Sequence, residues 1–169
     1  MTDFITTWSG KKFHFLTPKL EEINIYDIAH ALALTCRFGG HIKDFYSVAQ
    51  HSVLVARYSP RSCRLYGLLH DAHEAYLHDV PRPIKDYIPG YRELADRIQD
   101  VINKKYDVEP CECVTTFDKL ILATEARDLM LNRDGWEKLP EPLDITILPW
   151  DWQTAYISFL EEFFKLTKL

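Results

Sequence analysis

Two patterns of hydrophobic and polar residues divide the chain. In the first 15 residues, β-branched and aromatic residues in segments 5–8 and 12–15 flank the turn sequence Ser9-Gly10-Lys11. This arrangement is typical of a short β-hairpin. From residue 24 onward, apolar residues recur every three or four positions, which is the spacing of an amphipathic helix. The pattern therefore predicts a hairpin followed by a mostly helical chain.

Helix-starting residues mark several of the expected boundaries. Asn24 is suited to cap the first helix, and Ser47 with Gln50 has the form of a capping box at the start of the second. In that second helix His51 shares a side with Val48, so we expect its ring to point inward. The predicted helices cover about 24–36, from 47 onward, 62–78, 91–106, 116–132 and 151–166.

Prolines interrupt the helical pattern in two places. Pro81 and Pro83 forbid continuation of the third helix, so residues 79–85 should form a rigid loop. A second proline-rich stretch, 140–149, should be irregular and is too short for a separate domain. The sequence therefore predicts one all-α domain over residues 1–169, a bundle of about six helices with a short N-terminal β-hairpin.

Composition narrows the classes of partner. The 169 residues are 47% hydrophobic, which suffices for a single core, and the formal net charge is −5 with no Lys/Arg run. Polymeric nucleic acid is therefore not an expected partner. No apolar run approaches the roughly 20 residues that span a bilayer, and the N-terminus lacks the form of a signal peptide. We expect a cytoplasmic protein without a membrane partner.

The four cysteines are expected to be reduced and structural. Cys36 and Cys63 lie in apolar periodic segments, and Cys111 with Cys113 forms a Cys-x-Cys without the second pair that a zinc site needs. Buried cysteine commonly acts as a small hydrophobic residue.

A polar cluster interrupts the apolar third helix at His70, Asp71 and Glu74. Burying unpaired carboxylates in such a stretch costs several kcal/mol each unless they are paired or neutralised. Together with His51 and Asp118, two imidazoles and two carboxylates could surround a divalent cation, with Glu74 overhanging the same groove. Glu125 lies two helical turns beyond Asp118 on the same side, and we expect it to pair with an arginine.

Other metal chemistries fit these residues less well. A zincin needs two His at i and i+4, but His73 is followed by His78 at i+5. A two-iron oxygenase or a cyclic-dinucleotide phosphodiesterase needs further His ligands, and none follows His78. A regulatory protein that binds metal and nucleotide without turnover stays open as the alternative, as does a phosphodiesterase acting on another small phosphoester.

The arrangement of His51, the doublet His70-Asp71 and the distant Asp118 resembles that of the HD-domain phosphohydrolases. The resemblance runs from about residue 8 to residue 128. Segments 37–41 and 45–52 are similar to small bacterial and phage HD hydrolases, whereas 70–75 and the Asp-x-Pro-x-Pro loop at 79–85 are similar to bacterial 5'-deoxynucleotidases. Phage dATP phosphohydrolases are a further similar group. The resemblance implies a single HD-type helical domain.

The resemblance also implies roles for individual residues. His51, His70, Asp71 and Asp118 would hold the metal, and Glu74 would position or deprotonate the attacking water. The expected substrate contacts are Arg37 on phosphate, Phe38 on sugar or base, Asp79 on a sugar hydroxyl, and His41 and Lys85 as additional candidates for phosphate. Phe38 stands where the deoxynucleotidases have Trp, a departure that bears on sugar discrimination.

The activity implied is removal of phosphate from free nucleotides, foremost 2'-deoxynucleoside 5'-phosphates such as dAMP or dATP. Two nitrogen and two oxygen ligands suit Mn²⁺, Co²⁺, Ni²⁺, Fe²⁺ or Zn²⁺ better than Mg²⁺ or Ca²⁺. Small HD nucleotidases often pair, so the resemblance implies a homodimer or higher homo-oligomer.

Overall fold

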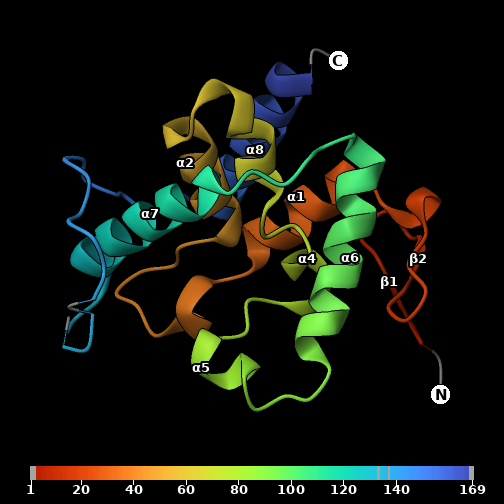
Figure 1. The fold of residues 1–169 in the computed structure, drawn as a ribbon, viewed down its shortest axis with the longest axis horizontal. Coiled ribbons are helices and arrows are strands. Elements are labelled where there is room, and N and C mark those ends of the chain that lie inside the picture. Colours follow the sequence, from red (N-terminus) through yellow and green to blue (C-terminus); the bar gives the residue numbers. More distant parts are fainter. Residues whose placement is uncertain (1–2, 133, 137, 168–169) are drawn as a thin grey trace.

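The computed structural model describes residues 3–132, 134–136 and 138–167. The chain is mostly helical with one two-stranded antiparallel sheet, as the sequence predicts (Figure 1). The strands are β1 (Phe4–Thr6) and β2 (Lys12–His14), and the short 3-10 helices are η1 (Leu20–Glu22), η2 (Arg37–Gly40) and η3 (Arg61–Cys63). The α-helices are α1 (Ile25–Leu34), α2 (Val48–Tyr58), α3 (Arg64–Leu69), α4 (Glu74–Leu77), α5 (Arg82–Lys85), α6 (Tyr91–Tyr106), α7 (Cys113–Leu129) and α8 (Trp152–Thr167).

The predicted hairpin is confirmed and is anchored to α1. Ile5 pairs with Phe13 in the antiparallel register, and Phe13 is fully buried. Asp27 in the first turn of α1 accepts hydrogen bonds from the Ser9 backbone N–H at 2.7 Å and from the Thr7 hydroxyl at 2.8 Å. The hairpin turn is therefore held against the helical core by one buried carboxylate.

Helix α2 occupies the centre of the fold, where it packs against α1, α3, α7 and α8. The main core joins buried side chains from the hairpin, α1, α2, α3, α6 and α8. In Figure 1 the hairpin and α7 lie at opposite ends of the long axis, with α2 and α8 between them. His51 is thus carried by the helix that contacts most of the bundle.

The predicted third helix, 62–78, is wrong as a continuous element. It is divided into η3, α3 and α4, with a turn at residues 70–73. Gln99 of α6 explains the break: its side-chain nitrogen donates to the Leu69 carbonyl at 2.8 Å, and its side-chain oxygen accepts from the His73 N–H at 3.2 Å. In an unbroken helix these two backbone groups would bond to each other. Insertion of a side chain into the helical ladder is a recognised cause of a kink.

The predicted loop at 79–85 is also partly wrong, because its second half forms the short helix α5. Pro83 lies in the first turn of this helix, where a backbone N–H has no intrahelical partner to lose. The capping prediction at Ser47 is confirmed, since its hydroxyl accepts from the Gln50 N–H at 3.1 Å. The Gln50 side chain, however, bonds to Leu148 and Trp150 and does not complete a capping box.

The expectation of reduced cysteines is wrong for one pair. Cys63 and Cys111 form a disulfide, although 48 residues separate them, whereas Cys36 and Cys113 are free. Packing of the loop before α7 against η3 brings the two side chains together, which local sequence patterns do not reveal. Among the described residues, no helix combines the length and the apolar character that a membrane crossing requires.

Candidate metal centre

His51, His70 and Asp118 converge from three elements that are distant in sequence. His51 lies on α2, His70 caps the end of α3 and Asp118 lies on α7. One ligand atom from each lies within 4.8 Å of the other two, so the three side chains could hold a metal ion together. Asp71 adjoins the group, with its Oδ2 atom 3.2 Å from His70 Nε2 and 3.7 Å from His51 Nε2. The structure therefore brings together all four side chains that the sequence selected as ligands.

Close packing of α2 against α3 sets the spacing of the two imidazoles. A Cβ atom added at Gly67 on α3 would lie 3.2 Å from the Ala56 Cα and 3.3 Å from the Ser59 hydroxyl. Glycine at this position therefore allows the helices to approach more closely than a larger residue would. The ring centres of His51 and His70 lie 5.4 Å apart.

Hydrogen bonds determine which nitrogen each histidine presents to the cluster. His51 Nδ1 donates to Glu125 Oε1 at 2.7 Å, and His70 Nδ1 donates to the Gly67 carbonyl at 2.8 Å. A carboxylate and a carbonyl only accept, so Nδ1 carries the hydrogen in both rings. Both Nε2 atoms are buried and form no hydrogen bond with any described residue. Once Nε2 loses its proton, imidazoles held in this way offer the Nε2 lone pair to a cation, which is the usual arrangement of histidine ligands.

The carboxylates make the cluster electrostatically suited to positive charge. Burial and the neighbouring Arg37 favour neutral His51, but Glu125 and Asp118 outweigh them and raise the His51 pKa to about 9. Burial likewise opposes the shift at His70, yet Asp71 raises the pKa of that ring. Against the effect of its own burial, the Asp71 carboxyl has a pKa well below its usual range because His70 lies beside it. Carboxylates that stabilise imidazolium in this way also favour a bound metal cation.

Glu125 is the residue whose full role the sequence did not reveal. The prediction that it pairs with an arginine is confirmed, because Arg37 Nη2 donates to Glu125 Oε2 at 3.1 Å. The same fully buried carboxylate also orients His51 through its other oxygen. Its position two helical turns beyond Asp118 was the available signal, but the bond to His51 depends on how α2 packs against α7.

Arg37 is buried between two carboxylates rather than extended into solvent. Besides the bond to Glu125, its Nη1 atom lies 3.9 Å from Asp71 Oδ2, and its Nε atom is buried without a hydrogen-bond partner among the described residues. The guanidinium also lies over the Phe38 ring, 5.2 Å from its centre. The Nε–H is therefore a buried guanidinium donor without a partner among the described residues.

Glu74 begins α4, one turn after Asp71, and its side chain is buried. Lys85 Nζ of α5 donates to Glu74 Oε1 at 3.1 Å, and Glu74 Oε2 is buried without a hydrogen-bond partner among the described residues. Burial, together with the charges of Asp71 and Asp79, outweighs Lys85 and raises the Glu74 pKa to about 8. The structure thus joins two of the predicted site residues in one pair beside the ligand cluster.

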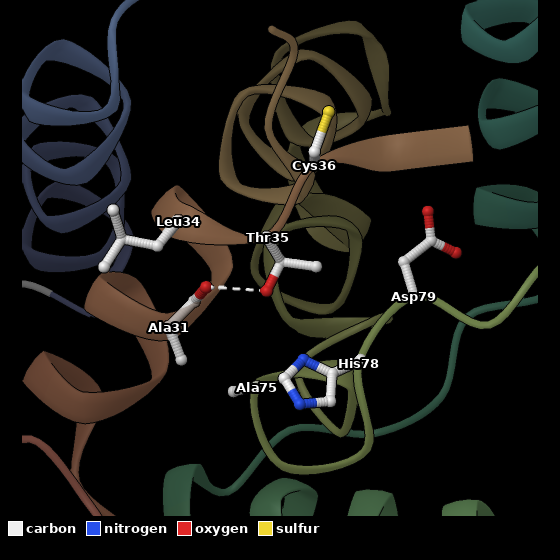
Figure 2. A pocket seen from close by; sticks show the side chains of 7 residues that line it. All are labelled: Ala31, Leu34, Thr35, Cys36, Ala75, His78 and Asp79. Atoms are coloured by element: carbon white, nitrogen blue, oxygen red, sulfur yellow. Dashed lines mark hydrogen bonds between the residues drawn. The ribbon is translucent and has the colours of Figure 1, made fainter. Parts of the chain in front are cut away.

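Asp79 lies on the loop after α4 and joins that loop to η2. Its Oδ2 atom accepts a hydrogen bond from the Phe38 N–H at 3.2 Å, where Phe38 has a φ of 57°. Asp79 also lines a cavity of about 410 Å³ (Figure 2). Figure 2 shows the Thr35 hydroxyl bonded back to the Ala31 carbonyl on one side of this cavity, with the His78 ring opposite. The other lining residues are Leu34, Cys36 and Ala75.

The last of the predicted substrate-binding residues is His41. It caps the end of η2 with an exposed side chain, and no hydrogen bond or ion pair joins that side chain to the described residues. Its expected phosphate contact stays a prediction.

Comparisons with known proteins give two relatives. The first, described as "Uncharacterized protein YfdR" from Escherichia coli (strain K12), is 40% identical over 173 positions that cover 98% of this chain and 97% of the relative. The second, "Uncharacterized protein RCAP_rcc00048" from Rhodobacter capsulatus, is 42% identical over 108 positions, or 58% of this chain and 55% of the relative. No protein-family model matches the sequence. Because the first similarity extends over nearly the full length of both chains, the protein belongs to the family of YfdR.

Proposed function

We propose that the protein is a metal-dependent phosphohydrolase of the HD type that removes phosphate from free nucleotides, foremost 2'-deoxynucleoside 5'-phosphates. One observation carries the proposal: two buried imidazole Nε2 atoms, both without a hydrogen-bond partner among the described residues, lie beside two carboxylates. Each Nε2 atom lies 3.2 Å from a carboxylate oxygen without completing a hydrogen bond, and this arrangement of buried donors and acceptors is typical of a site that binds a cation.

The residues fit one divalent transition-metal ion. His51, His70, Asp71 and Asp118 would hold it, and Mn²⁺, Co²⁺, Ni²⁺, Fe²⁺ and Zn²⁺ all accept this donor set. When bound, such an ion supplies positive charge to phosphoryl oxygens and acidifies a water molecule. Glu125 would hold the His51 ring and its tautomer, as outer carboxylates do at histidine metal sites.

Glu74 is suited to accept the proton of the attacking water. A general base works best when its pKa lies near the working pH, and the Glu74 pKa of about 8 meets that condition. Its free Oε2 atom is available for the proton, while Lys85 holds the other oxygen. Arg37, Lys85 and the ion would together provide the positive charges that surround a phosphate.

Recognition of a nucleoside sugar rests on Asp79 and the cavity beside it. The carboxylate would accept a hydrogen bond from a sugar hydroxyl, and its bond to the Phe38 N–H keeps it in place. The cavity of about 410 Å³ has room for part of a nucleoside. The acidic net charge of −5 disfavours a polyanionic strand and leaves the free nucleotide as the expected substrate.

The test is phosphate release from a panel of substrates by metal-stripped protein supplied in turn with each of the five metal ions. The panel contains dAMP, dATP, AMP, ATP and p-nitrophenyl phosphate. We expect metal-dependent release from the deoxynucleotides, with loss of activity in Asp118→Ala and retention in Asp96→Asn, which changes an exposed carboxylate on α6.

The same panel separates the alternatives. Tight metal and nucleotide binding without release from any substrate would favour the regulatory protein. Release from p-nitrophenyl phosphate alone would favour a phosphatase that acts on other phosphomonoesters. Activity that is equal with and without metal ion would contradict the proposal.

A further inference from the structure

A second group of reactive side chains lies apart from the candidate metal centre. The sulfur atoms of Cys63, Cys111 and Cys113 all lie within 4.8 Å of one another. Cys63 and Cys111 are joined by a disulfide, and the Cys113 sulfur lies 3.1 Å from the Cys111 sulfur. Cys36, the fourth cysteine, lines the cavity beside Asp79 and is not a member of this three-cysteine cluster.

The surroundings of the three-cysteine cluster make its sulfurs unequal. Cys63 is 8% exposed and packs in a small apolar group with Val55, Val114 and Ile121. Cys111 and Cys113 are only partly buried. A small thiol or disulfide in solution can therefore reach the Cys-x-Cys side of the cluster, while Cys63 is shielded.

The disulfide also links two elements of the candidate metal centre. Cys63 ends η3, directly before α3, and α3 ends at the residue before His70. Cys111 lies in the segment before α7, the helix that carries Asp118. The covalent bond therefore joins the beginnings of the two elements that supply these side chains.

We propose that the three-cysteine cluster is a thiol–disulfide exchange site in which Cys111 alternates between Cys63 and Cys113 as its disulfide partner. The Cys113 thiol loses its proton to solvent and its sulfur attacks the Cys111 sulfur. The Cys111–Cys113 bond forms, the Cys63–Cys111 bond breaks, and the electron pair leaves on the Cys63 sulfur, which takes up a proton. The Cys113 thiol is consumed and the Cys63 thiol is formed, so no net oxidation occurs.

Entry to the cycle needs an oxidant of the disulfide class. A small disulfide such as glutathione disulfide accepts two electrons from the reduced cluster and is released as two thiols, while one protein disulfide forms. Exchange then replaces the disulfide between Cys63 of η3 and Cys111, which precedes α7, by a disulfide within the Cys-x-Cys segment. A metal ion bound by three thiolates is the less favoured use, because the disulfide occupies two of the three sulfurs.

Trypsin cleavage sites make the two disulfides distinguishable by mass. Cys63 falls in the short peptide of residues 62–64, whereas Cys111 and Cys113 share the peptide of residues 106–119. The Cys63–Cys111 form yields the two peptides joined. The Cys111–Cys113 form yields the longer peptide alone, lighter by two hydrogen atoms than its reduced form. Cleavage after Glu112 then separates Cys111 from Cys113 and identifies the partner of Cys63.

The experiment equilibrates the folded, full-length protein in glutathione buffers of graded thiol-to-disulfide ratio, quenches with acid, blocks free thiols and maps the peptides. We expect both disulfide forms in the wild-type protein. We expect only the Cys63–Cys111 form in Cys113→Ser and only the Cys111–Cys113 form in Cys63→Ser. Cys36→Ser is the matched control and should give the wild-type distribution.

Three outcomes would overturn the proposal. The first is a wild-type map in which Cys113 is blocked as a free thiol in every oxidised molecule. The second is complete blocking of all three cysteines at every buffer ratio. The third is protection of all three thiols by one equivalent of added Zn²⁺ under oxidising buffer, which would identify a metal site instead.

Discussion

Replacement of Glu125 by Gln tests whether the buried carboxylate orients the candidate metal ligands. Gln has nearly the same shape, so the change removes the negative charge with little loss of packing. The Glu125 side chain is fully buried, and it accepts one hydrogen bond from Arg37 at 3.1 Å and one from His51 at 2.7 Å. After the change, the amide nitrogen would face one of the two donors, and Arg37 would lose its nearest negative charge, with the Asp71 carboxylate 3.9 Å away.

Two magnitudes follow from this geometry. Removal of one partner from a buried ion pair costs about 3–5 kcal/mol, and the second carboxylate near Arg37 places the expected loss near the lower end. At roughly 2–4 °C of Tm per kcal/mol for a chain of this size, a loss of about 3 kcal/mol lowers Tm by roughly 6–12 °C. Loss of an outer partner of a histidine ligand typically weakens metal binding by roughly 10–100-fold.

The matched control is Glu162→Gln. Glu162 on α8 is also buried and also pairs with an arginine, since Arg57 Nε donates to its Oε2 at 3.2 Å, but it lies outside the cluster. Metal affinity is measured by competition with a chromophoric chelator, and Tm by calorimetry of metal-stripped protein. Both variants should lose thermal stability, whereas only Glu125→Gln should lose metal affinity. Metal affinity of Glu125→Gln within threefold of wild type would refute the assigned role.

The remaining predictions concern four other side chains. Asp71→Ala should lower metal affinity by at least roughly 100-fold. It should also abolish the rise in Tm on metal addition, because an ion bound only by the folded state stabilises that state. Retention of one equivalent of metal by this variant would contradict the ligand set. Glu74→Gln should keep metal and nucleotide binding but lose roughly 10²–10⁴-fold in kcat, and activity within a few-fold of wild type would reject the role. The Glu74 pKa is about 8 in the folded protein and 4.5 ordinarily, so the unfolded chain loses this proton at lower pH. The free energy of unfolding of the metal-stripped wild-type protein should therefore fall as the pH rises from about 4.5 to 8, by up to about 1.4 kcal/mol per pH unit. Urea titrations at several pH values measure this slope, and the contribution of Glu74 should be absent in Glu74→Gln. Gln99→Leu should cost about 1–3 kcal/mol and weaken metal binding, because the Leu69 carbonyl and the His73 N–H lose their partner; unchanged metal affinity would show that the helix break does not position the ligands. Asp79→Ala should lower kcat/KM for dAMP with little change in Tm, because a sugar hydroxyl loses its acceptor, and an unchanged kcat/KM would remove the sugar-reading role.

Local sequence patterns were sufficient for most individual elements. The hairpin, the Asn24 cap of α1, the Ser47 cap of α2 and the bounds of α6 all agree with the structure. Each of these depends on contacts between residues a few positions apart, such as the bond from the Tyr26 N–H to the Asn24 side chain at 3.0 Å. Interactions of this range leave a direct record in the order of residues.

His70 and Asp71 could also be selected from the sequence, because charged residues in an apolar helix require partners, and the resemblance to HD-domain phosphohydrolases added His51 and Asp118. Their convergence could not be derived in the same way. It depends on Gly67 allowing α3 to approach Ala56 on α2, and on α7 packing against α2 so that Asp118 reaches the two histidines. The sequence identified the side chains, and the helix packing set the distances between them.

Only the tertiary structure decided three further features. Gln99, on α6, breaks the helix that local periodicity predicts as continuous through residues 70–73. Glu125 bonds His51 across 74 residues of sequence, and Cys63 pairs with Cys111 across 48. In each case the partner lies on another element, so its choice depends on how whole helices pack. The periodicity of one segment records which side of a helix is buried, but it does not record which polar group of another helix meets that side.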